Sequence, residues 1–256
     1  MNQKLKNAGF SLTEVLMAVG IFGVAMIFIA GAFPVAIHFA TIASEQTIAA
    51  VVADEAFAKI RLYGVNPSDP NMWFNHQVPF ENVKVTDISP DEFAYPSDPT
   101  VDIAQKQYYW SAICRRIEGN DVQVTVFVSR KIGAGTEYYV RDLINWLPIR
   151  QIGYPVAIPV EVRFAAGDEI IITDPDGSDD IGELAFVNDG YTIVEDSTGR
   201  IYRVLQRYET PAGTVQLDKD WDTAYPTDPG YVWVIPPPVA GGRYPCVGVF
   251  QKVIRF

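Results

Sequence analysis

The chain has 256 residues and a mass of 28.4 kDa; 48% of its residues are hydrophobic and 20% are charged. Such a chain can bury a core, which excludes a disordered or collagen-like protein. Acidic residues outnumber basic ones by 31 to 20, and the net charge of −11 disfavours a general electrostatic grip on nucleic acid. Two cysteines and two histidines do not suffice for a zinc cluster or a His-rich catalytic centre.

The first long feature of the chain is an apolar segment, residues 15–44, which contains no Asp, Glu, Lys or Arg. As a helix it would extend about 45 Å, against about 30 Å for the hydrocarbon core of a bilayer. The flank before it, residues 1–9, is basic and has no acidic residue. The positive-inside tendency therefore places this flank in the cytoplasm and the rest of the chain outside it.

A short pattern opens the apolar segment: Gly9-Phe10-Ser11-Leu12-Thr13-Glu14-Val15-Leu16. Glu14 is unexpected there, because a carboxylate in a bilayer costs a few kcal/mol and usually has a partner. The basic flank, the Gly-Phe pair, the spacing to Glu14 and the uninterrupted apolar run together closely resemble the processing site of type IV prepilins and of the pseudopilins of type II secretion systems.

The resemblance covers about the first 35 residues and implies a set of roles. In that family a membrane peptidase cuts after the glycine, here Gly9, and the new amino terminus, here Phe10, is methylated. The family's glutamate, here Glu14, neutralises the amino terminus of a neighbouring subunit during filament assembly. The implied partners are the prepilin peptidase, other pilin or pseudopilin subunits, an inner-membrane assembly platform and membrane lipid. The alternative is an uncleaved signal anchor with Glu14 at the headgroup level.

A helical pattern continues beyond the apolar segment. Apolar residues recur at three- to four-residue spacing over 45–63, and Gly64 with Asn66-Pro67 ends the helix. One helix over 11–63 would span about 80 Å, and its amphipathic second half should lie against a head.

The rest of the chain predicts β-structure. Residues 66–105 are rich in Pro and Asp and predict loops. Residues 108–117 and 121–131 predict a hairpin whose second strand turns a valine face to the core. A strand or short helix is expected at 137–143. Further strands are predicted at 160–164, 169–173, 184–187, 191–195, 200–208, 214–217, 231–235 and 247–256.

We therefore predict an α+β fold: a long, partly transmembrane N-terminal α-helix packed on an antiparallel β-sheet head, with an additional small β-barrel or sandwich-like module. The expected parts are a leader at 1–9, a transmembrane and assembly helix at 10–44, the amphipathic helix and first part of the head at 45–155, an inserted or appended β-module at 156–220, and C-terminal strands returning to the head at 221–256.

One acidic stretch offers oxygen ligands for calcium, through Asp174, Asp176, Asp179 and Asp180. The resemblance allows this role, because some pseudopilins bind calcium in loops of the head. The spacing departs from the EF-hand pattern, however, and Asp-Pro-Asp-Gly is also a strong turn sequence. A solvated acidic turn is therefore the competing interpretation, and no other cofactor is expected.

The remaining head residues of interest are cysteines and basic side chains. Cys114 and Cys246 would face an oxidising compartment, and they either form a disulfide or stay buried as free thiols. A DNA-uptake pilin would expose a basic patch, but antiparallel pairing separates the four clustered basic residues into two pairs at opposite ends of the hairpin. These residues are Arg115, Arg116, Arg130 and Lys131.

The sequence thus predicts a structural subunit of a type IV pilus or type II secretion filament, a minor pilin or pseudopilin, processed after Gly9 and assembled through its N-terminal helix. The expected location is a single pass of the inner membrane with an extracytoplasmic head, followed by an extracellular or periplasmic filament. The alternative is a monomeric, membrane-tethered extracytoplasmic binding module. An enzyme is not expected, because no catalytic constellation supports one.

Overall fold

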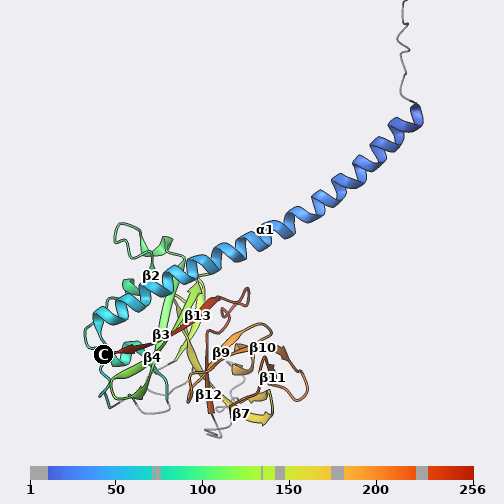
Figure 1. Ribbon diagram of the computed structural model, residues 1–256. Helices are drawn as coiled ribbons and strands as arrows, with labels where there is room; N and C mark the ends of the chain where they lie inside the picture. The colour runs from blue at the N-terminus through green and yellow to red at the C-terminus, as the bar shows by residue number, and fades with distance from the viewer. Residues whose placement is uncertain are drawn as a thin grey trace, which may run out of the picture. The chain divides into compact units, whose positions relative to one another are not determined.

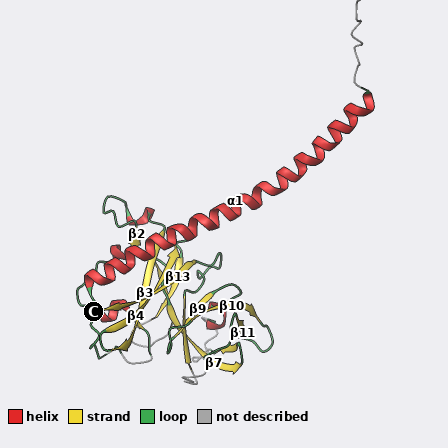
Figure 2. Cartoon of the chain, in the orientation of Figure 1, coloured by secondary structure: helices red, strands yellow, loops and turns green. Residues whose placement is uncertain are grey.

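The computed structural model describes residues 11–70, 72, 76–133, 135–141, 148–173, 182–222 and 230–256 (Figures 1 and 2). The chain divides into two compact units, residues 1–45 and 46–256. A long apolar helix is followed by antiparallel sheets and a closed six-stranded barrel, which confirms the predicted α+β class.

Helix α1 runs without interruption from Leu12 to Tyr63 and contains Pro34. In its last turns the buried residues recur every three or four positions, as an amphipathic helix requires. They are Ala49, Val52, Ala53, Ala56, Phe57 and Ile60. The helix ends where the sequence predicts, because Gly64 takes a φ of +73° that favours glycine, and its amide donates to the Ile60 carbonyl at 3.0 Å.

The main sheet of the head has five antiparallel strands in the order β1-β3-β4-β13, with β2 also paired to β3. Their bounds are β1 Val78–Pro79, β2 Ala94–Tyr95, β3 Tyr108–Glu118, β4 Asp121–Arg130 and β13 Cys246–Arg255. The predicted hairpin is β3–β4, and the last strand of the chain does return to this sheet. The valine face of β4 packs with the buried stripe of α1 in one core, as predicted.

Short elements connect and flank this sheet. They are α2 (Phe80–Val83), the 3₁₀ helices η1 (Pro90–Phe93) and η2 (Ile103–Gln105), and the separate hairpin of β5 (Glu137–Arg141) and β6 (Pro148–Ile152). The predicted loop at 66–105 is thus interrupted by single turns and two-residue strands, and β6 was not anticipated.

Six antiparallel strands close into a barrel in the order β10-β11-β8-β7-β12-β9. Their bounds are β7 Ile158–Ala166, β8 Glu169–Ile172, β9 Thr192–Glu195, β10 Ile201–Arg207, β11 Thr214–Leu217 and β12 Gly230–Val234. The structure therefore selects the barrel over the sandwich. Closure removes free strand edges, which stabilises so small a module.

Two expectations for this region are wrong. Residues Glu183–Phe186 form the 3₁₀ helix η3, where a strand was predicted at 184–187. Strand β12, which we placed among the strands returning to the head, instead pairs with β7 and β9 and closes the barrel. A run of β-forming residues predicts a strand but does not identify the strand's partner, which depends on long-range packing.

The sheet lies between two layers, because β4 is buried on both faces. Its valine face meets residues 46–63 of α1, and its opposite face meets the barrel through a separate core. This second core consists of Ile113, Phe127, Val194, Trp233 and Ile235.

Candidate assembly segment and seam of the head

The first half of α1 exposes its apolar side chains. The exposed fraction of the large apolar residues from Leu12 to Phe39 lies between 48% for Val15 and 77% for Leu12. By length and composition α1 can cross a membrane: its most apolar window has a mean hydropathy of 2.5, and none of that window is buried. Exposed apolar surface of this extent needs lipid or other helices to cover it.

Glu14 lies in the first turn of α1 and is exposed. The Ser11 carbonyl accepts the amide hydrogens of Glu14 at 3.0 Å and Val15 at 3.2 Å, which begins the helix. Between Leu12 and Ser44, Glu14 is the only charged residue. A carboxylate is favourable at a helix N-terminus, and within the described part of the chain no side chain pairs with it. Glu14 is therefore free to meet a cation supplied from elsewhere.

Several predicted site residues lie outside the described residues. They are Gly9 and Phe10 of the processing site and the four candidate calcium ligands Asp174, Asp176, Asp179 and Asp180.

The two cysteines are free thiols, so the disulfide alternative is not borne out. Cys114 lies opposite Val124 of β4, whereas Cys246 lies opposite Ser129, five positions or about 17 Å further along the strand. They also face opposite sides of the sheet, since Cys114 belongs to the helix–sheet core and Cys246 packs on the sheet–barrel core. Burial raises the pKa of Cys246 to about 12 and that of Cys114 further, so both stay protonated.

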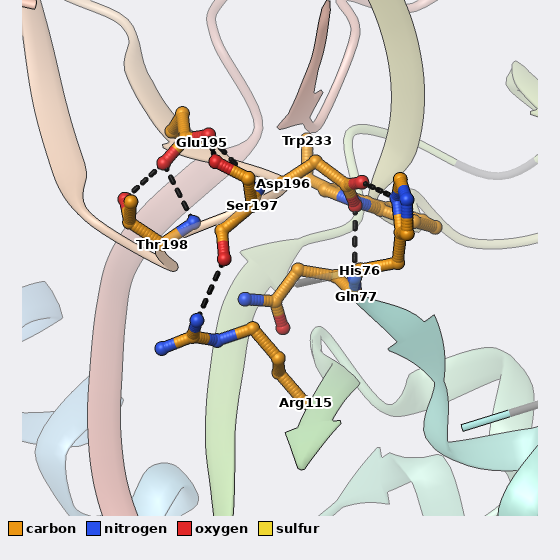
Figure 3. Close-up of polar contacts among 8 residues, drawn as sticks. All are labelled: His76, Gln77, Arg115, Glu195, Asp196, Ser197, Thr198 and Trp233. Atoms are coloured by element: carbon orange, nitrogen blue, oxygen red, sulfur yellow. Dashed lines mark hydrogen bonds and ion pairs between the residues drawn. The ribbon is translucent and has the colours of Figure 1, made fainter. Parts of the chain in front are cut away.

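A polar seam joins the sheet to the barrel at the β9–β10 turn, and Asp196 is its centre (Figure 3). One carboxylate oxygen of Asp196 accepts from the Gln77 amide at 2.9 Å and from the Trp233 indole at 2.7 Å, while the other lies 2.7 Å from His76 Nδ1. Accepting three hydrogen bonds satisfies a carboxylate that is only 7% exposed. His76 and Gln77 precede β1, so Asp196 ties the sheet edge to the barrel.

Glu195 and Arg115 make further hydrogen bonds to the β9–β10 turn. Glu195 accepts from the amides of Ser197 and Thr198 at 2.9 and 2.8 Å and from both of their hydroxyl groups (Figure 3). Arg115 then donates to the Ser197 carbonyl at 2.6 Å and to Gln123. Arg115 is therefore part of the seam and not part of an exposed basic patch, while Arg116 and Arg130 lie at opposite ends of the hairpin, as predicted.

Gly199 allows this turn to approach the sheet. Its φ is +70°, and a Cβ there would lie 2.7 to 2.9 Å from the amide groups of Gln77 and Gln123. A side chain at this position would push the barrel away from the sheet. The seam was not predicted, because His76 and Asp196 lie 120 residues apart in the sequence and no local pattern links them.

A family model for the prokaryotic N-terminal methylation motif matches residues 4–30. The chain carries the prepilin-type cleavage and methylation signature. The signature spans the segment that holds Gly9, Phe10 and Glu14, and it supports a type IV pilin-like or pseudopilin-type protein. Comparisons with curated proteins and with solved structures gave no match. Together, the signature and the apolar helix fit a membrane-anchored protein with an extracytoplasmic head.

Proposed function

We propose that the protein is a minor pilin or pseudopilin, a structural subunit of a type IV pilus or type II secretion filament. Prepilin peptidase cleaves it after Gly9 at the inner membrane, and the assembly platform adds it to a filament through α1. The observation that carries the proposal is the prepilin-type signature on a helix whose first half is apolar and exposed and holds Glu14 as its one charge.

The physical argument for assembly is the cost of Glu14. In the membrane a carboxylate without a partner is unfavourable by a few kcal/mol, and pairing with the amino terminus of a neighbouring subunit offsets that cost. Lateral packing of α1 between subunits also covers the apolar surface after it leaves the lipid. Glu14 therefore favours the assembled filament over the membrane-inserted monomer.

The test of this role is Glu14→Ala. Cleavage and membrane insertion should stay as in the wild type, because both precede assembly, while incorporation into filaments is lost. Thr13→Ala, in the same turn but with the carboxylate kept, is the matched control and should incorporate normally. Immunoblots of membrane and sheared filament fractions measure both steps. Normal incorporation of Glu14→Ala would remove the pairing role.

A role as a minor subunit is supported by the size of the head. The six-stranded barrel adds a second module to the sheet, and bulky heads are hard to repeat along a tightly packed filament axis. We therefore place the protein as a minor, tip-located subunit with a structural and not a catalytic role. Counting subunits in purified filaments by quantitative mass spectrometry tests this: a few copies agree with it, and a number close to that of the most abundant subunit contradicts it.

The alternative function, a membrane-tethered binding module that does not assemble, keeps the same head and differs at the amino terminus. It predicts an uncleaved chain and no filament phenotype for Glu14→Ala. The Glu14 test above therefore also separates these two functions.

A further inference from the structure

The head contains a cleft of about 630 Å³ at the junction of its two β-modules. Its walls come from α2, β3, the β5–β6 hairpin, the connection at 153–157, and strands β7 and β12 of the barrel. Cavities of roughly 300 to 1,000 Å³ at such junctions are the usual size and place of small-molecule sites. Neither the prepilin-type signature nor the assembly role uses this cleft.

The connection at 153–157 is fixed against the sheet, so the cleft exists before any ligand enters. The Ala157 amide donates to Ser111 Oγ at 3.2 Å, and Ser129 Oγ donates to the Pro155 carbonyl at 3.0 Å. The Tyr154 ring stacks on Tyr109 at a centroid distance of 4.7 Å. A preformed wall lowers the ordering cost of binding.

The floor of the cleft is apolar and rigid. Its buried lining residues include Phe80, Phe93, Ile113, Ile158 and Trp233. The indole of Trp233 is oriented by its 2.7 Å hydrogen bond to Asp196, so the polar seam also sets one wall of the cleft. This floor suits the apolar body of a ligand.

The mouth of the cleft has one charge. Among the described lining residues Glu81 is the only group charged at neutral pH, and no Lys, Arg or His lines the cavity. The Glu81 carboxylate is exposed and makes no hydrogen bond or ion pair within the described part of the chain. Partial burial of its carboxyl group raises the pKa of Glu81, and the positive charge of Lys84 opposes this. A carboxylate at the cleft favours a cation over an anion.

Tyr154 adds a hydrogen-bonding group to the lining of the cleft. Burial first, and the charge of Glu81 second, raise the pKa of Tyr154 to about 12, so its hydroxyl group stays protonated at neutral pH. Glu81 and Tyr154 both line the cleft. Together with Asn82, Ser111 and Gln151 they supply the polar groups of a mainly apolar lining.

We propose that this cleft binds a small organic cation, with its apolar body against the wall formed by Ile113, Ile158 and Trp233 and its ammonium group at Glu81. The charge of the protein agrees with this ligand class, because a net charge of −11 attracts cations and repels anionic amphiphiles. The inference is independent of filament assembly, since every residue that carries it lies in the unit 46–256.

Three probes of one shape test the proposal: 4-phenylbutylammonium, neutral 4-phenylbutanol and anionic 4-phenylbutyrate. Equilibrium dialysis of the full-length protein in phosphatidylcholine nanodiscs measures binding, with empty nanodiscs subtracted. We expect the ammonium probe to bind about tenfold more tightly than the alcohol, as a hydrogen bond to a charged group allows, and the carboxylate to bind most weakly. Equal binding of the cation and the anion, or no saturable binding of the cation, overturns the proposal.

Three variants locate the site. Glu81→Gln should reduce the affinity of the ammonium probe to that of the alcohol and leave the alcohol unchanged. Gly153→Leu should weaken binding of both, because Gly153 lines the cleft and a Cβ there meets no atom within 4 Å, so the longer side chain can be accommodated and takes up part of the binding space. Glu209→Gln, at an exposed turn of the barrel, is the matched control and should bind like the wild type. Unchanged ammonium binding by Glu81→Gln also overturns the proposal.

Discussion

Both halves of α1 are largely apolar, but their surroundings are opposite. From Leu12 to Phe39 the large apolar side chains are exposed, whereas Val52, Phe57 and Ile60 are at most 4% exposed in the core of the head. The difference lies in the charges. The first half holds Glu14 alone, while the second half places charged residues such as Asp54 and Arg61 on its exposed face.

This contrast shows that apolar content by itself does not identify a protein core. A helix that is apolar on every side can be covered only by lipid or by other helices, whereas an apolar stripe bounded by charges is covered by its own chain. One helix therefore carries the assembly surface and the anchor of the head. The predictions below separate these two roles.

The largest effect should come from cutting the chain between the halves. Residues 46–256 form one compact unit that contains the three hydrophobic cores, so this fragment should be a soluble, acidic, β-rich monomer. The full chain should require detergent. Circular dichroism and analytical ultracentrifugation measure both properties, and a mainly helical spectrum or an insoluble fragment would contradict the division.

A pair of matched isoleucine substitutions sharpens the contrast. Ile60→Ala removes a fully buried side chain from the helix–sheet core and should destabilise the head by about 2–5 kcal/mol. Ile29→Ala removes a side chain that is 58% exposed and should leave the head within about 0.5 kcal/mol of the wild type. Urea unfolding of the full chain in non-ionic detergent, followed by tryptophan fluorescence, checks both. Equal effects would mean that the halves do not differ.

Replacing the paired Lys59 in the second half of α1 should change the free energy of unfolding by a smaller amount. Lys59 Nζ lies 2.7 Å from Glu92 Oε2 and 3.1 Å from Glu55, and it also donates to the Glu92 carbonyl and to Ser97. Its side chain is 11% exposed, so Lys59→Met should cost about 1–3 kcal/mol. Lys84→Met is the control, because its partner Asp87 is fully exposed at 3.9 Å and such pairs contribute about 0–1 kcal/mol. The same urea titration compares the two, and similar losses would refute the buried network.

The smallest effect concerns pH and the polar seam. The hydrogen bond to Asp196 raises the pKa of His76, burial opposes this, and the charge of Asp196 adds to it. The His76–Asp196 pair therefore stabilises the folded state fully below the pKa of His76 in the unfolded chain, about 6.5. This stabilisation is lost as pH rises through the raised pKa of the folded state. Because His76 is half exposed, the change should stay below about 1 kcal/mol.

The comparison that isolates this pair is His76→Asn. Urea midpoints of the wild type should fall slightly between about pH 6 and pH 8, and those of the variant should fall less. Identical pH profiles would show that the pair contributes nothing to the stability of the head.

Local patterns were enough to predict the long helix, its stop at Gly64 and the β3–β4 hairpin. Each depends on a period or a turn read within about twenty residues, and the structure confirms all three. The valine face of β4 also identified the surface that receives the helix, because alternation in a strand assigns side chains to faces.

Long-range pairing could not be read in this way. Strand β12 closes the barrel, Arg115 reaches Ser197, and Cys114 and Cys246 lie on opposite faces of the sheet. Each of these placements depends on packing between segments that are distant in sequence. The cleft at Glu81 was missed for the same reason, since its lining residues span positions 79–233.

The intact mass of the protein, extracted from membranes of cells with an active prepilin peptidase, shows whether the chain is processed as a prepilin. We expect the loss of residues 1–9, which removes Lys4 and Lys6, and the addition of one methyl group at Phe10. An intact amino terminus would contradict it and would favour a signal anchor that never enters a filament.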